Sequence, residues 1–508
     1  MSQKQPNFLI LMADQLTPGA LRAYGHRVTK APNIDALAET GVVFDSAYCN
    51  SPLCAPSRYS FMAGQLPSRI GAFDNAAEFA AAIPTFAHYL RRAGYRTILS
   101  GKMHFCGADQ LHGFEERLTS DIYPADFGWT PDWERPSHRP SWYHNMSSVT
   151  EAGVCVRSNQ LDFDDEVAFT ARRKIFDLAR SERDRPFCLV VSLTHPHDPY
   201  AITEEYWSRY EDAAIDMPRV AFSAARLDPH SRRLRQVCEL DTTPISERQI
   251  RNARRAYYGA ISYVDDQIGA LRATLGEAGL ADDTIIILLA DHGEMLGERG
   301  LWYKMSFFEH ASRVPLIVSA PRRFAPRRVA QSVSLVDILP TLVEIAGDGE
   351  AGDYAMPIDG RSLLPHLSGA GGHDEVIGEY LAEGAVAPLV MIRRGRHKFI
   401  HAPGDPDQLY DLAADRDELV NLAEDKRAAE DVGRFRAECA ARWDLPALRA
   451  AVVASQRRRH FVAASLSMGE YHSWDFQPFR DASRQYVRNH LDLDDIEAAA
   501  RLPRRGAQ

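Results

Sequence analysis

Largely apolar runs of strand length alternate with helix-like segments along this chain, and this alternation limits the folds that it can adopt. Four such runs stand out, at residues 8–13, 96–100, 186–193 and 284–290. Runs without a polar–apolar alternation are typical of strands buried on both faces, as in parallel sheets. Parallel strands need long crossover connections, and the helix-like segments between the runs supply them. We therefore predict an α/β fold with a large, mostly parallel sheet sandwiched by helices.

Polar side chains follow each of the four runs. The set comprises Asp14 after the first run, Lys102 and His104 after the second, His195 and His197 after the third, and Asp291 and His292 after the fourth. The carboxyl ends of parallel strands meet at one edge of a sheet, where open α/β sheets bind their ligands. A single strand-end acid or core histidine is common without any function. Four independent clusters at the same edge predict a functional site there.

The character of the chain changes beyond about residue 380. Residues 389–401 are typical of a β-hairpin, and acidic and Arg-rich helical sequence fills residues 418–459. We predict three parts: a catalytic α/β domain at 1–380, a smaller α+β domain at 381–460, and a C-terminal arm at 461–508. We expect the aromatic arm to serve oligomerisation and active-site closure, and the alternative is a partly ordered chain end.

Composition narrows the class of protein. Of the 508 residues, 45% are hydrophobic and 25% are charged, which is typical of a globular protein. The net charge of −10 argues against a nucleic-acid-binding protein, because nothing would offset phosphate repulsion. The seven cysteines are scattered, so we predict no disulfide framework. The apolar run at 8–13 is too short for a signal peptide or a membrane span, and we expect a cytoplasmic protein without membrane attachment.

One short motif carries the strongest chemical prediction. Residues 54–58 are Cys-Ala-Pro-Ser-Arg, and Gly64 follows six residues after the arginine. Pro56 suits a helix start, so Cys54 is expected at the positive end of a helix. Arg58 is expected one turn further on, on the same face. A reactive sulfur beside a guanidinium suits an anionic substrate, whereas the alternative for Cys54 is a small buried thiol.

This motif resembles the C/S-x-P-x-R signature of the type I sulfatases, a family of the alkaline phosphatase superfamily. The resemblance implies that formylglycine-generating machinery oxidises Cys54 to formylglycine, an aldehyde whose hydrate attacks sulfur. It also implies one divalent metal ion, held by Asp14, Gln15, Cys54, Asp291 and His292. Ca²⁺ is the first expectation, with Mn²⁺ or Mg²⁺ as alternatives, since oxygen ligands dominate. Many relatives have an acid in place of Gln15 and an asparagine in place of His292, which leaves ligation by Gln15 open and strengthens the case for Mn²⁺.

The resemblance also implies roles in catalysis. It assigns three cations to the sulfate pocket, namely Arg58, Lys102 and Lys304. His104 is expected to act as the base that deprotonates the remaining diol hydroxyl and so releases sulfate. His197, together with Lys304, is expected to protonate the leaving group, and His195 is the second candidate for this role.

Within the family, the chain most resembles the choline-sulfatases. The matching stretches are residues 12–16, 49–58 and 72–75 and the aromatic C-terminal arm. The resemblance implies choline-O-sulfate as the substrate and a homo-oligomer, either a dimer or a tetramer.

A quaternary ammonium cannot donate a hydrogen bond, so aromatic faces and carboxylates must hold it. Trp129, in the long irregular stretch 113–159, is the predicted aromatic wall, and its alternative role is packing beneath a lid. Glu383 is the predicted carboxylate. Asn75, His144 and Asn145 are expected near the sulfate or the choline chain.

Two other functions stay open on the sequence alone. The first is a phosphonate monoester or phosphodiester hydrolase, because related enzymes share the metal site. The second is a non-catalytic protein that binds sulfated ligands, which would apply if Cys54 remains a thiol.

Overall fold

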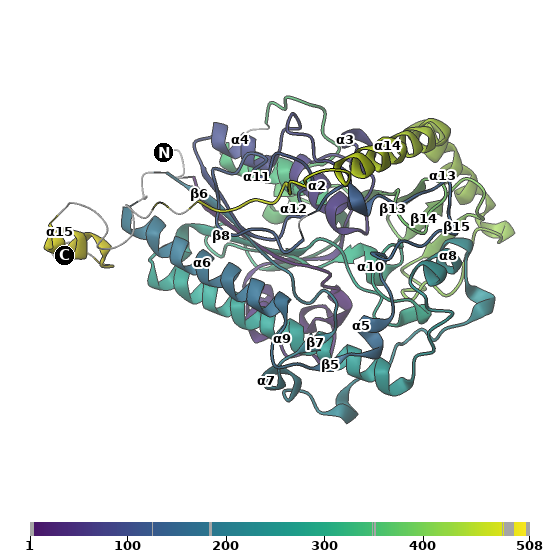
Figure 1. Cartoon of the computed structure of the whole chain (residues 1–508), viewed down its shortest axis with the longest axis horizontal. Helices are drawn as coiled ribbons and strands as arrows, with labels where there is room; N and C mark the ends of the chain where they lie inside the picture. The colour runs from purple at the N-terminus through teal and green to yellow at the C-terminus, as the bar shows by residue number, and fades with distance from the viewer. Residues whose placement is uncertain are drawn as a thin grey trace.

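Among the described residues, a large β-sheet flanked by helices, a smaller four-stranded sheet and a short two-stranded sheet form the structure of this chain (Figure 1). The structure is a computed structural model, and it describes residues 5–123, 125–181, 185–347, 349, 352–479, 481 and 492–503. Within these residues no helix is long and apolar enough to cross a membrane.

The large sheet has nine strands. Along the sheet their order is β11 (Arg327–Ser334), β2 (Val42–Tyr48), β10 (Leu316–Ser319), β8 (Thr284–Ala290), β1 (Asn7–Ala13), β6 (Phe187–Leu193), β3 (Arg96–Gly101) and β4 (Glu116–Arg117), and β9 (Arg313–Val314) pairs with β2. Among the described strands of this sheet, the pairings of β9 with β2 and of β10 with β2 and β8 are antiparallel, and the others are parallel. The predicted α/β fold with a mostly parallel sheet is therefore confirmed.

The four predicted buried runs form the centre of this sheet. Strands β8, β1, β6 and β3 are consecutive and parallel, with Leu9 opposite both Ile286 and Leu189. Their side chains are almost fully buried because helices cover both faces. Since the strands are parallel, the residues that follow them meet at one edge of the sheet.

Helices lie on both faces of the large sheet. The long helices α6 (Asn159–Ser181) and α9 (Glu247–Glu277) lie side by side on one face, and α2 (Cys54–Ala63), α4 (Phe86–Arg92) and α11 (Ile338–Ala346) lie on the other (Figure 1). The other helices of this body are α1 (Pro32–Thr40), α3 (Pro67–Ile70), α5 (Ser147–Thr150), α7 (Glu204–Trp207), α8 (Pro229–Val237), α10 (Glu309–Ser312) and α12 (Leu364–Ser368).

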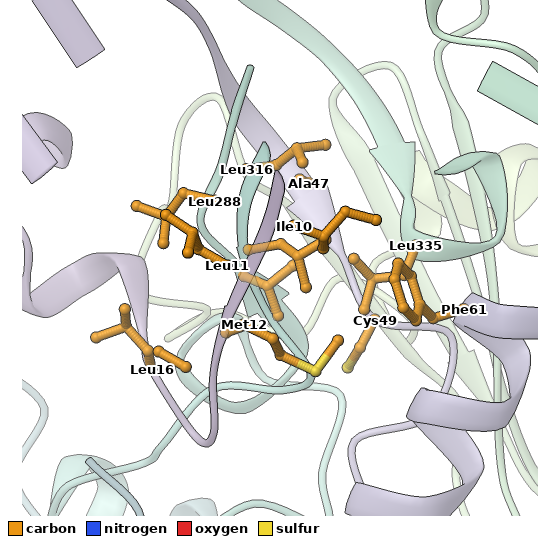
Figure 2. Packing of buried hydrophobic residues seen from close by; sticks show 14 of the residues in the cluster. Ile10, Leu11, Met12, Leu16, Ala47, Cys49, Phe61, Leu288, Leu316 and Leu335 are labelled. Carbon is orange, nitrogen blue, oxygen red and sulfur yellow. The ribbon is translucent and has the colours of Figure 1, made fainter. Parts of the chain in front are cut away.

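The core fills both faces of the central strand. Figure 2 shows Ile10, Leu11 and Met12 of β1 surrounded by side chains from neighbouring strands and from α2. Met12 extends toward Cys49, next to Phe61 of α2 (Figure 2). This packing fixes α2 against the sheet just below the edge where the strand-end residues gather.

A smaller antiparallel sheet follows the large one. Its order is β12 (Glu375–Tyr380), β13 (Leu389–Arg394), β14 (His397–His401) and β15 (Gln408–Asp411), and α13 (Ala429–Arg442) covers it through a separate hydrophobic cluster. The predicted hairpin is formed by β13 and β14. This sheet begins at Glu375, a few residues before the predicted boundary at 380, and the domain limits remain a prediction.

The C-terminal region leaves the smaller sheet as one long helix. Helix α14 (Leu445–Leu466) runs back over the upper face near α2 and α3, and the chain then extends across the molecule (Figure 1). Helix α15 (Leu493–Ala500) lies at the far left of Figure 1, away from α2. Parts of the predicted arm, at 480, 482–491 and 504–508, lie outside the described residues.

The stretch predicted to be irregular contains little regular structure. Between residues 118 and 158 the described elements are the 3₁₀ turn η3 (Phe127–Trp129), α5 and β5 (Gly153–Val154), which pairs with β7 (Ala201–Ile202).

Candidate active site

Four strand-end and helix-start side chains converge at the edge of the large sheet. Ligand-type atoms of Asp14, Cys54, Asp291 and His292 all lie within 4.8 Å of one another, and all four residues are buried. The His292 Nε2 atom lies 3.2 Å from Cys54 Sγ and 3.7 Å from Asp14 Oδ1. His292 Nδ1 lies 3.0 Å from the carbonyl oxygen of Gly293, which accepts its proton and leaves Nε2 free to act as a ligand.

Helix α2 places both ends of the Cys-Ala-Pro-Ser-Arg motif. Cys54 is the first residue of α2, and the backbone N–H of Ala55 donates to Asn75 Oδ1 at 3.0 Å. Arg58, one turn on, is fully buried between two acids. Its guanidinium donates to Asp291 Oδ2 at 2.8 Å and to Asp14 Oδ2 at 3.1 Å.

Lys102 completes this charge cluster. Its ammonium group donates to Asp14 Oδ2, and the ring centroid of Tyr123 lies 4.4 Å from the same nitrogen. Burial by itself raises the pKa of Asp14, but Lys102 and Arg58 outweigh it and hold that pKa below its usual value. Asp14 is therefore an ionised, buried carboxylate.

Gln15 directs its side chain toward the second group of polar residues. Its backbone N–H donates to Asp291 Oδ1 at 3.0 Å. Its side-chain amide donates to Asp198 and Glu294, and its Oε1 accepts from Lys304 at 2.7 Å. In this arrangement the side-chain oxygen of Gln15 orients Lys304.

His197 and Lys304 lie in direct contact. Lys304 Nζ is 2.9 Å from His197 Nε2, and His197 Nδ1 donates to the Asp198 carbonyl oxygen at 2.7 Å. His144 lies beside them, with its Nδ1 3.6 Å from Asp198 Oδ2 and its ring stacked on Tyr303. Burial, followed by nearby Lys304, lowers the pKa of His144, which favours the neutral imidazole.

His195 takes a different direction from His197. Its Nδ1 lies 2.7 Å from Asp164 Oδ2, and its ring packs edge-on against Tyr263 of α9. Asp164 also accepts the backbone N–H groups of Thr194 and His195. This pair fixes the turn that carries His197 rather than contacting Lys304.

His104 is buried with both ring nitrogens unpaired among the described residues. Its ring centroid lies 5.7 Å from Trp129 and 5.9 Å from Tyr123, and these two rings lie 6.0 Å apart. His104 also contributes to the lowered pKa of the Cys54 thiol, which indicates that the two residues are close. A histidine with free nitrogens beside Cys54 is available for proton transfer.

Glu383 is a buried acid without a salt bridge in the described part of the chain. It is 5% exposed, and its Oε2 has no hydrogen-bond partner among the described residues. Burial raises the pKa of Glu383 to about 7, and the negative charge of Asp74 adds to this rise. Asn145 is engaged locally, since its Oδ1 accepts from Ser147 N and its carbonyl oxygen accepts from Tyr303.

The electrostatics at position 54 favour an anion. Burial by itself raises the pKa of the Cys54 thiol, but Lys304, Lys102 and His292 together hold it well below its usual value. The ammonium groups of Lys304 and Lys102 and a helix start lie around this atom, so negative charge that develops here is stabilised.

The acids at this edge fit a divalent cation. Asp14 Oδ1 is buried and has no hydrogen-bond partner among the described residues. An unpaired buried carboxylate oxygen is costly unless a cation or proton takes it. Two carboxylates and one imidazole nitrogen are the ligands that Ca²⁺, Mg²⁺ or Mn²⁺ accept, and Mn²⁺ tolerates the nitrogen best.

Three residues of this site were not singled out from the sequence. Asp198 links His197, His144 and Gln15, Tyr123 contacts Lys102, and Glu294 holds the amide of Gln15. The signal for Asp198 was present, because it directly follows His197 after a buried strand. Tyr123 was one of several aromatic residues in an irregular stretch, and nothing local distinguished it.

A buried thiol, fixed cations and a histidine without hydrogen-bond partners among the described residues gather at one edge of the sheet, an arrangement that suits a hydrolase acting on esters of an oxyanion. The family models agree with this class. The Sulfatase model matches residues 6–348, the model for the N-sulphoglucosamine sulphohydrolase C-terminal region matches 297–441, and the model for the choline sulfatase C-terminal region matches 450–502. The chain therefore belongs to the sulfatase family and is a sulfuric ester hydrolase.

Individual relatives give a consistent result. The chain is 49% identical to the choline-sulfatase of Rhizobium meliloti (strain 1021), over 99% of this chain and 100% of that protein. It is 28% identical to arylsulfatase K of Xenopus laevis, over 82% of this chain and 79% of the relative. The solved phosphonate monoester hydrolase of Agrobacterium radiobacter has a TM-score of 0.68 at 28% identity and covers 88% of this chain and 96% of its own.

Proposed function

We propose that this enzyme hydrolyses choline-O-sulfate to choline and sulfate. The observation that carries the proposal is the 49% identity, over nearly the full length of both chains, to a choline-sulfatase. The aromatic group beside His104 supports it, because aromatic faces attract a cationic substrate that cannot donate a hydrogen bond.

Position 54 is proposed as the nucleophile, in the form of hydrated formylglycine. His104 takes a proton from the hydroxyl at this position, since its ring nitrogens are free and it lies near Cys54. His197 and Lys304 supply a proton to the leaving alcohol. The two residues contact each other, and the ring of His144 lies beside His197. Arg58 and Lys102 neutralise the carboxylates of Asp14 and Asp291, which leaves the ammonium group of Lys304 to attract the sulfate.

A divalent metal ion is proposed at the same edge. Asp14, Asp291, His292 and position 54 would hold it, and Gln15 is kept as a further candidate ligand. When bound, such an ion polarises an S–O bond and lowers the pKa of a coordinated hydroxyl. In the present arrangement the side chain of Gln15 binds Lys304 instead, so its contribution would be to position that ammonium group.

The ammonium end of the substrate is proposed to bind between Trp129 and Glu383. Trp129 lies next to His104, and Glu383 is a buried acid without a cation partner among the described residues. Asn75, His144 and Asn145 are proposed around the sulfate and the ethyl chain. A carboxylate beside a quaternary ammonium would recover the free energy that its burial costs.

Hydrolysis of phosphonate monoesters is the second candidate function. The similarity to the phosphonate monoester hydrolase of Agrobacterium radiobacter, at 28% identity and a TM-score of 0.68, favours it. A phosphonate monoester lacks the quaternary ammonium, so the Trp129 and Glu383 sites would then be unused. A non-catalytic binder of sulfated ligands, the other alternative that the sequence left open, is not supported, because the chain belongs to a family of sulfuric ester hydrolases.

Two measurements test these proposals. Turnover of choline-O-sulfate, an aryl sulfate and a phosphonate monoester is compared at equal enzyme concentration, and we expect the highest kcat/KM for choline-O-sulfate. Mass spectrometry of the peptide that contains Cys54 is expected to show an aldehyde. Cys54→Ala should lower turnover by about 10³-fold or more, and Cys155→Ala, at a half-buried cysteine that is not part of the cluster around Asp14, is the control. An unmodified Cys54 with full turnover would falsify the proposed nucleophile.

A further inference from the structure

The segment that carries Trp129 is a single 3₁₀ turn, and the hydrogen bonds within it are all local. Within it, Asp126 accepts the backbone N–H of Gly128, and Thr130 Oγ1 donates to the Phe127 carbonyl. A short 3₁₀ turn without further support does not hold an aromatic wall in one position. The Trp129 ring packs against His104 and Tyr123, and further side-chain contacts to the segment come from the C-terminal region.

Helix α14 contacts this segment through Gln456, Arg459 and His460. Gln456 Oε1 accepts the backbone N–H of Trp133 at 3.0 Å, and His460 Nε2 lies 3.2 Å from the Pro131 carbonyl oxygen. Beyond the helix, Tyr471 donates to Asp126 at 2.6 Å, and Trp474 packs edge-on against Phe127. Positions more than 300 residues apart in sequence are thus joined.

Arg459 is the buried centre of these contacts. Its two terminal nitrogens donate to the two carboxylate oxygens of Asp74 at 2.5 and 2.7 Å, and one of them also lies 3.3 Å from Thr130 Oγ1. Arg459 is 5% exposed and Asp74 is fully buried. The Arg459 guanidinium therefore joins Thr130, which follows Trp129, to Asp74, which precedes Asn75.

Asn75 continues this chain of contacts to the nucleophile position. Its Oδ1 accepts the backbone N–H of Ala55, the residue after Cys54. Arg459 thus fixes the Trp129 segment and the start of α2 relative to each other. The charge of Arg459 is neutralised by Asp74, so it does not repel a cationic substrate.

We propose that Arg459 is a positioning residue that determines specificity for a cationic sulfate ester, a role that rests on the proposed function. It acts by holding Trp129 at a fixed distance from position 54. Recognition of the ammonium group depends on the position of Trp129 relative to residue 54. Sulfuryl transfer depends on residue 54 and not on Trp129. Loss of Arg459 therefore weakens choline-O-sulfate binding more than it slows the chemical step.

The test compares choline-O-sulfate with 4-nitrophenyl sulfate in the full chain. Arg459→Lys keeps the positive charge but loses the bidentate hydrogen bonds to Asp74. We expect KM for choline-O-sulfate to rise by about 10-fold with kcat within about twofold, and kcat/KM for the aryl sulfate to change by less than about twofold. Arg458→Lys, at the exposed neighbouring arginine of α14, should leave both substrates unchanged.

Two further variants protect the test against a folding defect. The pair Asp74→Asn with Arg459→Gln avoids a buried unpaired charge. Gln456→Ala releases Trp133 without touching Asp74 and should give the same pattern in weaker form. Equal losses on both substrates, or no rise in KM in any variant that melts like the wild type, would overturn the role of Arg459. A wild-type enzyme that hydrolyses only the aryl sulfate would instead overturn the proposed substrate.

Discussion

Asp14 and Glu383 are both buried acids, yet their surroundings shift their pKa values in opposite directions. Burial raises both values. For Asp14, contacts with Lys102 and Arg58 more than offset this effect. Glu383 has no such contact among the described residues, and its pKa rises to about 7. The difference indicates two kinds of site. Asp14 is paired with cations of the protein itself, whereas Glu383 is available to a cation of the substrate.

Glu383 makes stability depend on pH in a defined direction. The native state holds a proton on Glu383 between its ordinary pKa of 4.5 and about 7, whereas the unfolded state has released it. Stability therefore falls as pH rises through this range, by on the order of 3 kcal/mol from this residue, and is constant above it. Urea unfolding of the wild type and Glu383→Gln across this range measures the difference, and the variant should lack this slope. Glu78→Gln, at an exposed glutamate, is the control; parallel curves for all three proteins would contradict the assignment.

The same ionisation is expected to affect the substrate. Ionised Glu383 attracts the quaternary ammonium, so KM for choline-O-sulfate should fall as pH rises from about 6 to about 8. KM for an aryl sulfate should not follow this profile. Steady-state kinetics at several pH values measure both, and Glu383→Gln should remove the dependence for choline-O-sulfate. A KM for choline-O-sulfate that stays constant over this range would argue against Glu383 as its partner.

At the residue scale, the sequence predicted which side chains gather but not how they pair. Asp14, Asp291 and His292 follow buried parallel strands, so their meeting at one edge follows from topology. The direction of the Gln15 side chain depends on Lys304, which lies almost 290 residues later. A local sequence pattern cannot predict a contact between residues so far apart in the chain. The contact between Gln15 and Asp198 was not predicted for the same reason.

The glycine of the motif, Gly64, ends helix α2. Its last turn ends at Gly64 in the left-handed conformation, with φ of 65°, and the Gly64 N–H donates to the Ser60 carbonyl. A Cβ at this position would also lie 3.2 Å from Leu339 Cβ in the core. The glycine after the arginine of the motif is therefore required by the helix end.

Gly64→Ala tests this requirement. We expect a loss of about 1–2 kcal/mol in the free energy of unfolding, from the left-handed backbone and the close contact with Leu339. Gly276→Ala is the matched control, because this exposed helical glycine of α9 has open space around it, and alanine should raise stability by about 0.5–1 kcal/mol. Urea unfolding measures both. Equal effects of the two substitutions would show that the conformation of Gly64 is unimportant.

Elements with a clear hydrophobic period were predicted from the sequence, whereas for the stretch 113–159 the sequence predicted the irregularity but not the conformation. The strands and the long helices follow from buried runs and helical spacing in the sequence. The segment around Trp129 takes its shape from α14, through Arg459 and Gln456. Its conformation is therefore set by tertiary contacts, which leave no period in the sequence.

At the scale of the whole molecule, the C-terminal arm leaves large apolar side chains exposed. Phe461, Met468 and Phe479 are 74%, 86% and 90% exposed in the single chain. We predict a dimer or tetramer in which a second copy covers these residues. Light scattering after gel filtration should give this mass for the full chain and a smaller mass for a chain ending at Leu466. A monomeric full chain, or a truncated chain of unchanged assembly state, would contradict the prediction.

Removal of divalent metal tests the metal site proposed at the edge of the large sheet. Asp14 and Asp291 lie close together there, with one carboxylate oxygen unpaired among the described residues, so a bound cation should stabilise the fold as well as support turnover. A metal at 100 times its Kd adds about 2.7 kcal/mol to the free energy of unfolding. Treatment with a chelator should therefore lower Tm by several degrees and abolish sulfate release. Readdition of Ca²⁺, Mn²⁺ or Mg²⁺ should restore both, and the ion that restores them at the lowest concentration identifies the preferred metal.

A variant separates this site from nonspecific effects of the chelator. His292→Gln removes the nitrogen ligand while keeping a polar side chain of similar reach, so its Tm should respond only weakly to added metal. A loss of the chelator effect in this variant would locate the ion beside Asp14 and Cys54. If the wild type kept both its Tm and its turnover after complete removal of divalent ions, the unpaired oxygen of Asp14 would need another partner, and the charge balance proposed for this edge would be wrong.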